Sequence, residues 1–147
     1  MNTLRKLLVP VDFSDPSQRA LEDAIALAKT WGAELHLLHC YSIHPAAIDP
    51  YGLAYPQSFE LEIREAAGRR LSEWSAKAEA EDLKVTQHLS ARFPSDEINE
   101  LAESLGVDLI VMGTRGLSGI KHVLLGSVAE RTLRGAPCPV WVSRTAI

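Results

Sequence analysis

Long apolar runs and paired cysteines are missing from this chain of 147 residues. No stretch approaches the ~18 consecutive apolar residues that a membrane-spanning helix needs. The two cysteines, Cys40 and Cys138, form no CxxC pair. Their spacing argues against a zinc site or a disulfide framework and favours burial of both as small apolar residues. The first segment, MNTLRKLLVPVDFS, has no signal-peptide cleavage pattern, so we expect a cytoplasmic protein with no membrane partner.

Several motifs of phosphate and acyl chemistry are also missing. The sequence contains no GxxxxGK[ST], no GxGxxG and no GxSxG, which excludes a P-loop, a dinucleotide fingerprint and a hydrolase nucleophile elbow. The five histidines show neither triad nor metal-ligand spacing. The net charge of −4 argues against nucleic acid as a partner. A hydrophobic content of 46% over residues 1–147 predicts one domain with a proper core.

Buried apolar segments alternate with amphipathic ones along the whole chain. Strands are expected over 7–11, 34–41, 84–91, 108–113 and 139–143, and helices over 15–31, 59–78, 95–105 and 127–134. Strict alternation predicts an α/β fold with a parallel sheet and helices on both faces. Asp15 and Pro16 are typical of an N-cap followed by the first helical residue. Gly32, Gly106 and Gly135 are expected to end three of the helices.

The glycine-rich stretch GTRGLSGIKHVLLGS, 113–127, separates the fourth strand from the last helix. Glycines let the backbone approach an anion, and a helix N-terminus adds unpaired N–H groups. Ligands of open α/β sheets bind at the carboxyl ends of the strands, which here are Asp12, 40–41 and Gly113 onward. The stretch therefore predicts a phosphate site. Ser127 and Glu130 are also expected to form a capping box, since a cap and an anion site share the same N–H groups. The alternative to the phosphate site is a merely structural loop.

Three segments resemble the universal stress protein family and together extend over the whole chain. Gly113-x2-Gly116-x9-Gly126-Ser127 is similar to the family's nucleotide-binding signature, while VPVDFS and GSVAERTLRGAPCPVWVSR resemble its first strand and turn and its C-terminal segment. The resemblance implies an open five-stranded parallel sheet of order 3-2-1-4-5, Rossmann-like and adenine nucleotide alpha hydrolase-like. It also implies ATP binding and, commonly, a homodimer.

The resemblance, carried over by motif, gives the nucleotide-binding residues as Pro10, Val11, Asp12, Cys40, Met112, Gly113, Gly116, Gly126, Ser127 and Val128. It implies that Asp12 contacts the ribose or adenosine end and that the backbone near Cys40 meets adenine. The last four of these residues would surround the phosphates. Arg115 is our own addition from its position between two glycines, where it could supply charge to the phosphates or be a solvated loop charge. A divalent cation such as Mg²⁺ would be carried by the phosphates.

These expectations describe an ATP-binding, dimeric stress-response regulator with at most slow hydrolysis. The C-terminal strand near Trp141 would pair with a second copy. A nucleotide hydrolase or adenylyl-transfer enzyme and a nucleotide-independent interaction module remain alternatives. The sequence departs from the family at Phe93, because members often have glycine at this position before the proline. The aromatic ring of Phe93 would narrow the pocket. The segment 42–57, rich in proline and tyrosine, is a candidate lid.

Overall fold

The computed structural model describes residues 3–43, 57–115 and 125–144. Strands and helices alternate along them as predicted, in the order β1 (Lys6–Pro10), α1 (Asp15–Trp31), β2 (Glu34–Cys40), α2 (Gln57–Glu79), β3 (Val85–Ser90), α3 (Pro94–Leu105), β4 (Leu109–Gly113), α4 (Ser127–Gly135) and β5 (Val140–Ser143). Each predicted element is present, with ends that coincide with the prediction or differ from it by at most two residues. No helix in these ranges is long and apolar enough to cross a membrane.

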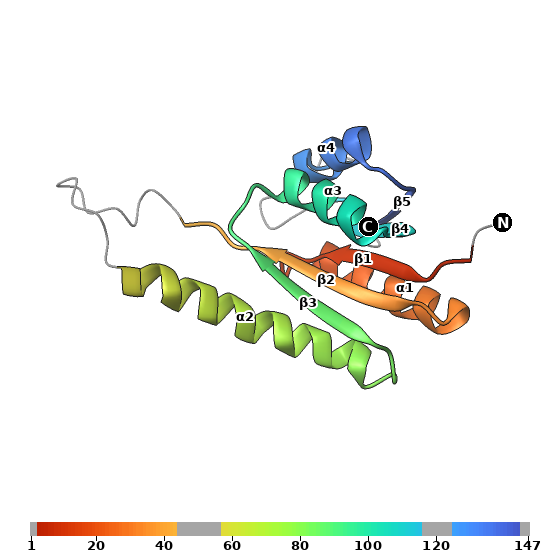
Figure 1. Ribbon diagram of the computed structural model, residues 1–147, viewed down its shortest axis with the longest axis horizontal. Helices are drawn as coiled ribbons and strands as arrows, with labels where there is room; N and C mark the ends of the chain where they lie inside the picture. Colours follow the sequence, from red (N-terminus) through yellow and green to blue (C-terminus); the bar gives the residue numbers. More distant parts are fainter. Residues whose placement is uncertain (1–2, 44–56, 116–124, 145–147) are drawn as a thin grey trace.

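All five strands are parallel, and their order in the sheet is β3-β2-β1-β4-β5, as the resemblance implied. Helices α1 and α2 lie on one face of the sheet, and α3 and α4 lie on the other (Figure 1). Alternate strand residues enter two cores: Leu7 and Val9 pack toward α1 and α2, and Leu8 and Ile110 pack toward α3. Burial on both faces explains why these strands are continuous apolar runs.

The start of α1 differs from the prediction, because Ser14 and not Asp15 is the N-cap. The Ser14 hydroxyl accepts a hydrogen bond from the Ser17 N–H, at 3.4 Å. Asp15 is the first helical residue, where its charge faces the positive end of the helix dipole. The chain therefore enters α1 one residue earlier than the Asp-Pro pattern suggests.

Two of the three glycines expected to end helices do so in the left-handed conformation, Gly32 with φ of 69° and Gly106 with φ of 64°. Gly135 also ends its helix, but as the last residue of α4 and not as a left-handed cap, because the C-cap is Ala136 in extended conformation. A Cβ at Gly135 would lie 2.7 Å from Nδ2 of Asn99, so this glycine allows α3 and α4 to pack closely.

Candidate functional site

The carboxyl ends of β1 and β4 mark the place where an open α/β sheet has its ligand-binding crevice, and the two strands pair over only a short length. The register pairs only Leu7 and Leu8 of β1 with β4, whereas β1 pairs with β2 over five residues up to Pro10. The Val11 N–H donates to the Leu38 carbonyl of β2 at 2.8 Å, and N–H directions alternate along a strand, so the Pro10 nitrogen faces β4. Because proline has no N–H, it ends the β1–β4 ladder there. Strand order also reverses at this point, which is where open α/β sheets bind ligands.

The N-terminus of α4 is fastened to the end of β4 beside this crevice. The Gly126 N–H donates to the Thr114 carbonyl at 2.6 Å, and the Thr114 N–H donates to the Ser143 carbonyl of β5 at 3.2 Å. A Cβ at Gly126 would lie 3.2 Å from the Thr114 oxygen. Glycine at this position therefore lets the helix start approach the strand closely.

No described side chain caps α4, whose N-cap is Gly126. The predicted capping box of Ser127 and Glu130 is therefore absent. The Glu130 N–H donates to the Gly126 carbonyl, and the Glu130 carboxylate pairs with Arg134 at 2.6 Å. The N–H groups of the three residues before Glu130 have no intrahelical acceptor. Ser127 is exposed, so an anion could reach these groups, which carry the positive end of the helix dipole.

Asp12 lies two residues after the end of β1 and is fixed by Ser14, the N-cap of α1. Its Oδ1 accepts hydrogen bonds from the Ser14 N–H, at 3.0 Å, and from the Ser14 hydroxyl. The Asp12 N–H donates to the Ser17 hydroxyl oxygen at 3.3 Å. The side chain is half-buried, so it supports the helix start while retaining access to solvent at the carboxyl end of β1.

Gly113, the last residue of β4, has a packing role of its own. A Cβ there would lie 2.7 Å from the carbonyl carbon and 2.8 Å from the carbonyl oxygen of Pro16, both backbone atoms of the first turn of α1. Only a residue without a side chain allows α1 to begin so close to β4. Met112, which precedes it, is buried against α3 and α4.

The remaining predicted site residues are placed as follows. Cys40 ends β2 and is a half-buried free thiol; burial raises its pKa to about 12. Cys138 is also a half-buried free thiol, and burial raises its pKa; the two cysteines are therefore only partly buried, not fully buried as expected. Arg115 is half-buried after β4. Gly116 and residues 44–56 of the candidate lid lie outside the described residues, and the roles of all site residues stay predictions.

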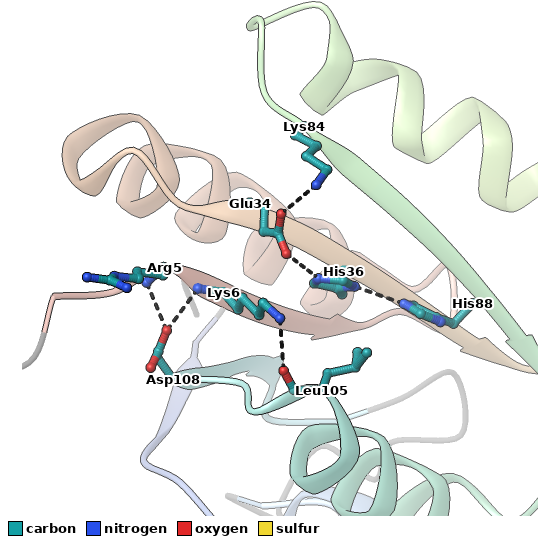
Figure 2. Close-up of polar contacts among 8 residues, drawn as sticks. All are labelled: Arg5, Lys6, Glu34, His36, Lys84, His88, Leu105 and Asp108. Atoms are coloured by element: carbon teal, nitrogen blue, oxygen red, sulfur yellow. Dashed lines mark hydrogen bonds and ion pairs between the residues drawn. The ribbon is translucent and has the colours of Figure 1, made fainter.

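A separate polar cluster lies toward the amino-terminal ends of the strands (Figure 2). Oδ2 of Asp108 accepts the N–H groups of Arg5 and Lys6, each at 2.9 Å. Glu34 pairs with Lys84 at 3.0 Å and with His36 at 3.0 Å. The hydrogen bond from Lys84 first, and then that from His36, hold the pKa of Glu34 below its usual value. Within the part of the chain described, no three or more His, Cys, Asp or Glu residues could hold a metal ion.

Comparison with known proteins decides the family. A model of the universal stress protein family matches residues 3–144. The chain belongs to this family. Universal stress protein MJ0531 of Methanocaldococcus jannaschii is 37% identical over 96% of this chain and 82% of its own. Universal stress protein YxiE of Bacillus subtilis is 35% identical over 95% and 98%.

Solved structures of the family agree with the observed fold. The structure of MJ0577, a universal stress protein of Methanocaldococcus jannaschii, covers 99% of both chains with a TM-score of 0.85 and 28% identity. A universal stress protein in complex with cAMP covers 99% of this chain and 100% of its own with a TM-score of 0.69 and 27% identity. The resemblance read from the glycine spacing is thereby confirmed.

Sequence reasoning missed two residues beside the crevice. Thr114 is buried and joins β4, β5 and α4 through its backbone; its neighbours in sequence give no sign of this. Phe13 adopts a positive φ of 67°, which is rare for a residue with a side chain. In VPVDFS the chain leaves a strand and enters a helix within a few residues, which predicts a turn near Phe13. An aromatic residue, however, gives no indication that the turn is left-handed.

Proposed function

We propose that this universal stress protein binds an adenine nucleotide, with ATP as the first candidate, in the crevice between β1 and β4. The observation that carries the proposal is the uncapped N-terminus of α4, held against the end of β4 by the Gly126–Thr114 hydrogen bond. In this arrangement the phosphates lie at Gly126, Ser127 and Val128. Such a helix start supplies N–H groups and a favourable dipole to an anion.

The rest of the nucleotide lies toward β1 and β2. Asp12 accepts hydrogen bonds from the ribose hydroxyls, and the backbone at Cys40 meets adenine. Pro10, Val11, Met112 and Gly113 line the floor of the crevice, and Gly116 completes the glycine pattern. A family member crystallised with cAMP supports an adenosine moiety. Arg115 and a Mg²⁺ ion carried by the phosphates would balance the negative charge.

Hydrolysis in this site is at most slow. One oxygen of Asp12 already accepts two hydrogen bonds from Ser14, so it is engaged and poorly placed to take a proton from an attacking water. Binding without fast turnover suits a regulator that reports nucleotide level in a stress response. We place the whole of 1–147 in one domain with this role.

Self-association through β5 belongs to the same proposal. β5 is an edge strand of the sheet, and Trp141 on it is 46% exposed. An edge strand with an exposed aromatic side chain is suited to pairing with the same strand of a second copy. A partner protein bound at this edge without any nucleotide is the second candidate function.

The proposal is tested by identifying what the purified protein carries. The protein is isolated without added nucleotide and denatured, and the released small molecules are analysed by mass spectrometry. Calorimetric titration with ATP, AMP and GTP follows on the emptied protein. We expect a released adenine nucleotide and saturable ATP binding. An empty protein that takes up no adenine nucleotide would overturn the proposal and favour the interaction module at β5.

A further inference from the structure

The turn that presents Asp12 is held in an unfavourable backbone conformation. Phe13 has a φ of 67°, and a left-handed residue with a side chain costs roughly as much as a lost hydrogen bond because its Cβ crowds the following carbonyl. Such a conformation persists only where the surroundings hold it. The question is which contacts hold Phe13.

The Phe13 ring is surrounded on the face of the sheet that α1 and α2 cover. Its centroid lies 4.3 Å from the His39 ring and 5.3 Å from the Trp74 ring, which meets it edge-on at 72°. The guanidinium carbon of Arg70 lies 4.4 Å above the Phe13 ring. Edge-to-face aromatic pairs and a cation over a ring are both favourable arrangements. Two of these partners come from α2 and one comes from β2.

His39, one of the residues around the Phe13 ring, also contacts the backbone just before the turn. Nδ1 of His39 lies 2.8 Å from the Val11 carbonyl oxygen. Burial lowers the pKa of His39, so the ring is neutral near pH 7 and its Nδ1–H donates to that carbonyl. Val11 is therefore fixed on one side of Asp12 by His39, and Ser14 is fixed on the other by its bond to the Asp12 carboxylate at 3.0 Å.

We infer that Phe13 is a positioning residue for nucleotide binding, whose ring locks the left-handed turn that presents Asp12 to the crevice. The inference rests on the proposed function, since Asp12 is its binding residue. Phe13 itself packs on the face opposite α4 and need not touch the ligand. Without the ring contacts, only a fraction of the molecules keeps the left-handed turn that presents Asp12. The apparent affinity for the nucleotide is then reduced in proportion to that fraction.

Two substitutions separate this role from simple core filling. Both Phe13→Ala and Phe13→Gly remove the ring, but glycine adopts a positive φ without steric cost. Phe13→Ala should weaken ATP affinity about tenfold, which corresponds to about 1.4 kcal/mol. Phe13→Gly should weaken it less. If Phe13 only filled space in the core, Phe13→Gly should weaken ATP affinity as much as Phe13→Ala or more, because glycine fills less space than alanine.

Leu35→Ala is the matched control, since Leu35 is fully buried in the same core but lies near the start of β2, far from the turn. It should lower the melting temperature and leave ATP affinity close to that of the wild type. An Asp12→Asn background completes the set. If Phe13 acts through Asp12, Phe13→Ala should add little to the loss already caused by Asp12→Asn.

Amide hydrogen exchange gives a readout that needs no nucleotide. The Ser14 N–H bonded to Asp12 should exchange faster in Phe13→Ala, whereas the Val11 N–H bonded to Leu38 at 2.8 Å should change little. The inference is overturned if Phe13→Ala binds ATP as tightly as Phe13→Gly, or if exchange at Ser14 is unchanged. A wild type that binds no nucleotide would refute the proposed function, and exchange at Ser14 would still decide the role of Phe13.

Discussion

Nδ1 of His36 lies 2.9 Å from Nε2 of His88, and the other ring nitrogen of His36 faces the Glu34 carboxylate at 3.0 Å. The register of the sheet produces this contact, because His36 and His88 come from neighbouring strands. Nε2 of His36 carries its proton toward the carboxylate. Nδ1 of His36 therefore accepts a hydrogen bond from the Nε2–H of His88.

Acidification should destabilise the protein in the range where histidines titrate. Burial, and then the charge of His36, lower the pKa of His88, while Glu97 opposes them; burial also lowers the pKa of His39. The unfolded chain, with histidine pKa values near 6.5, binds protons before the folded state does. Stability is therefore complete above about pH 6.5 and falls as the pH drops through the folded pKa values.

His88→Gln checks this account, since a glutamine amide can still donate to His36 but does not titrate. Its free energy of unfolding, measured by urea denaturation from pH 8 to pH 5, should fall less on acidification than that of the wild type. The lowered pKa of His39 contributes to the slope that remains. Parallel curves for the two proteins would contradict the lowered pKa of His88.

Gly113→Ala should strongly destabilise the fold. The new Cβ would meet backbone atoms of Pro16 at 2.7 to 2.8 Å, and overpacking of this kind typically costs about 1–3 kcal/mol. Gly68→Ala is the matched control. Its Cβ would lie 3.8 Å from a Leu89 methyl, and alanine is favoured over glycine within a helix by up to about 1 kcal/mol. Thermal unfolding should show opposite shifts for the two variants; equal shifts would contradict the contact with Pro16.

Gly126→Val tests the placement of the phosphates. Gly126 has an ordinary φ of −72°, so valine causes no backbone strain, but its Cβ would press on Thr114 and Arg115 at 3.2 and 3.4 Å. The start of α4 should move from β4 with a modest loss of stability, and ATP binding should be abolished. Unchanged affinity in calorimetry would show that the phosphates lie elsewhere. Gly126→Ala, which adds less bulk, should have an intermediate affinity.

Trp141→Lys should weaken the proposed self-association through β5. Trp141 is 46% exposed on the edge strand, and a lysine there would have to lose water to be buried against a second copy. Trp31→Lys is the control, because Trp31 is also exposed, at 38%, but lies at the end of α1. Light scattering should give a lower mass for the first variant alone. An unaltered mass for Trp141→Lys would remove β5 from the interface.

The parallel sheet was predictable because strands that are buried on both faces are continuous apolar runs in the sequence. The strand order was predictable because the glycine spacing resembles that of a known family. Local sequence patterns gave wrong details at helix ends whose structure depends on contacts with other segments. Ser127 and Glu130 match a capping box, but the N-cap of α4 is Gly126, whose N–H is bonded to the Thr114 carbonyl. Gly135 does end α4, but without the left-handed conformation of a glycine cap; its lack of a side chain instead leaves room for Asn99. These contacts join segments far apart in sequence, so no local pattern could reveal them.

The central claim is that adenine nucleotide lies at the start of α4 and beside Asp12. Titration of the isotope-labelled protein with ATP, followed through its backbone amide NMR signals, tests the location directly. We expect the largest shifts at the amides of Ser127, Val128 and Asp12, with little change at His88 on the far part of the sheet. Saturable binding that leaves those three amides unmoved would contradict the account.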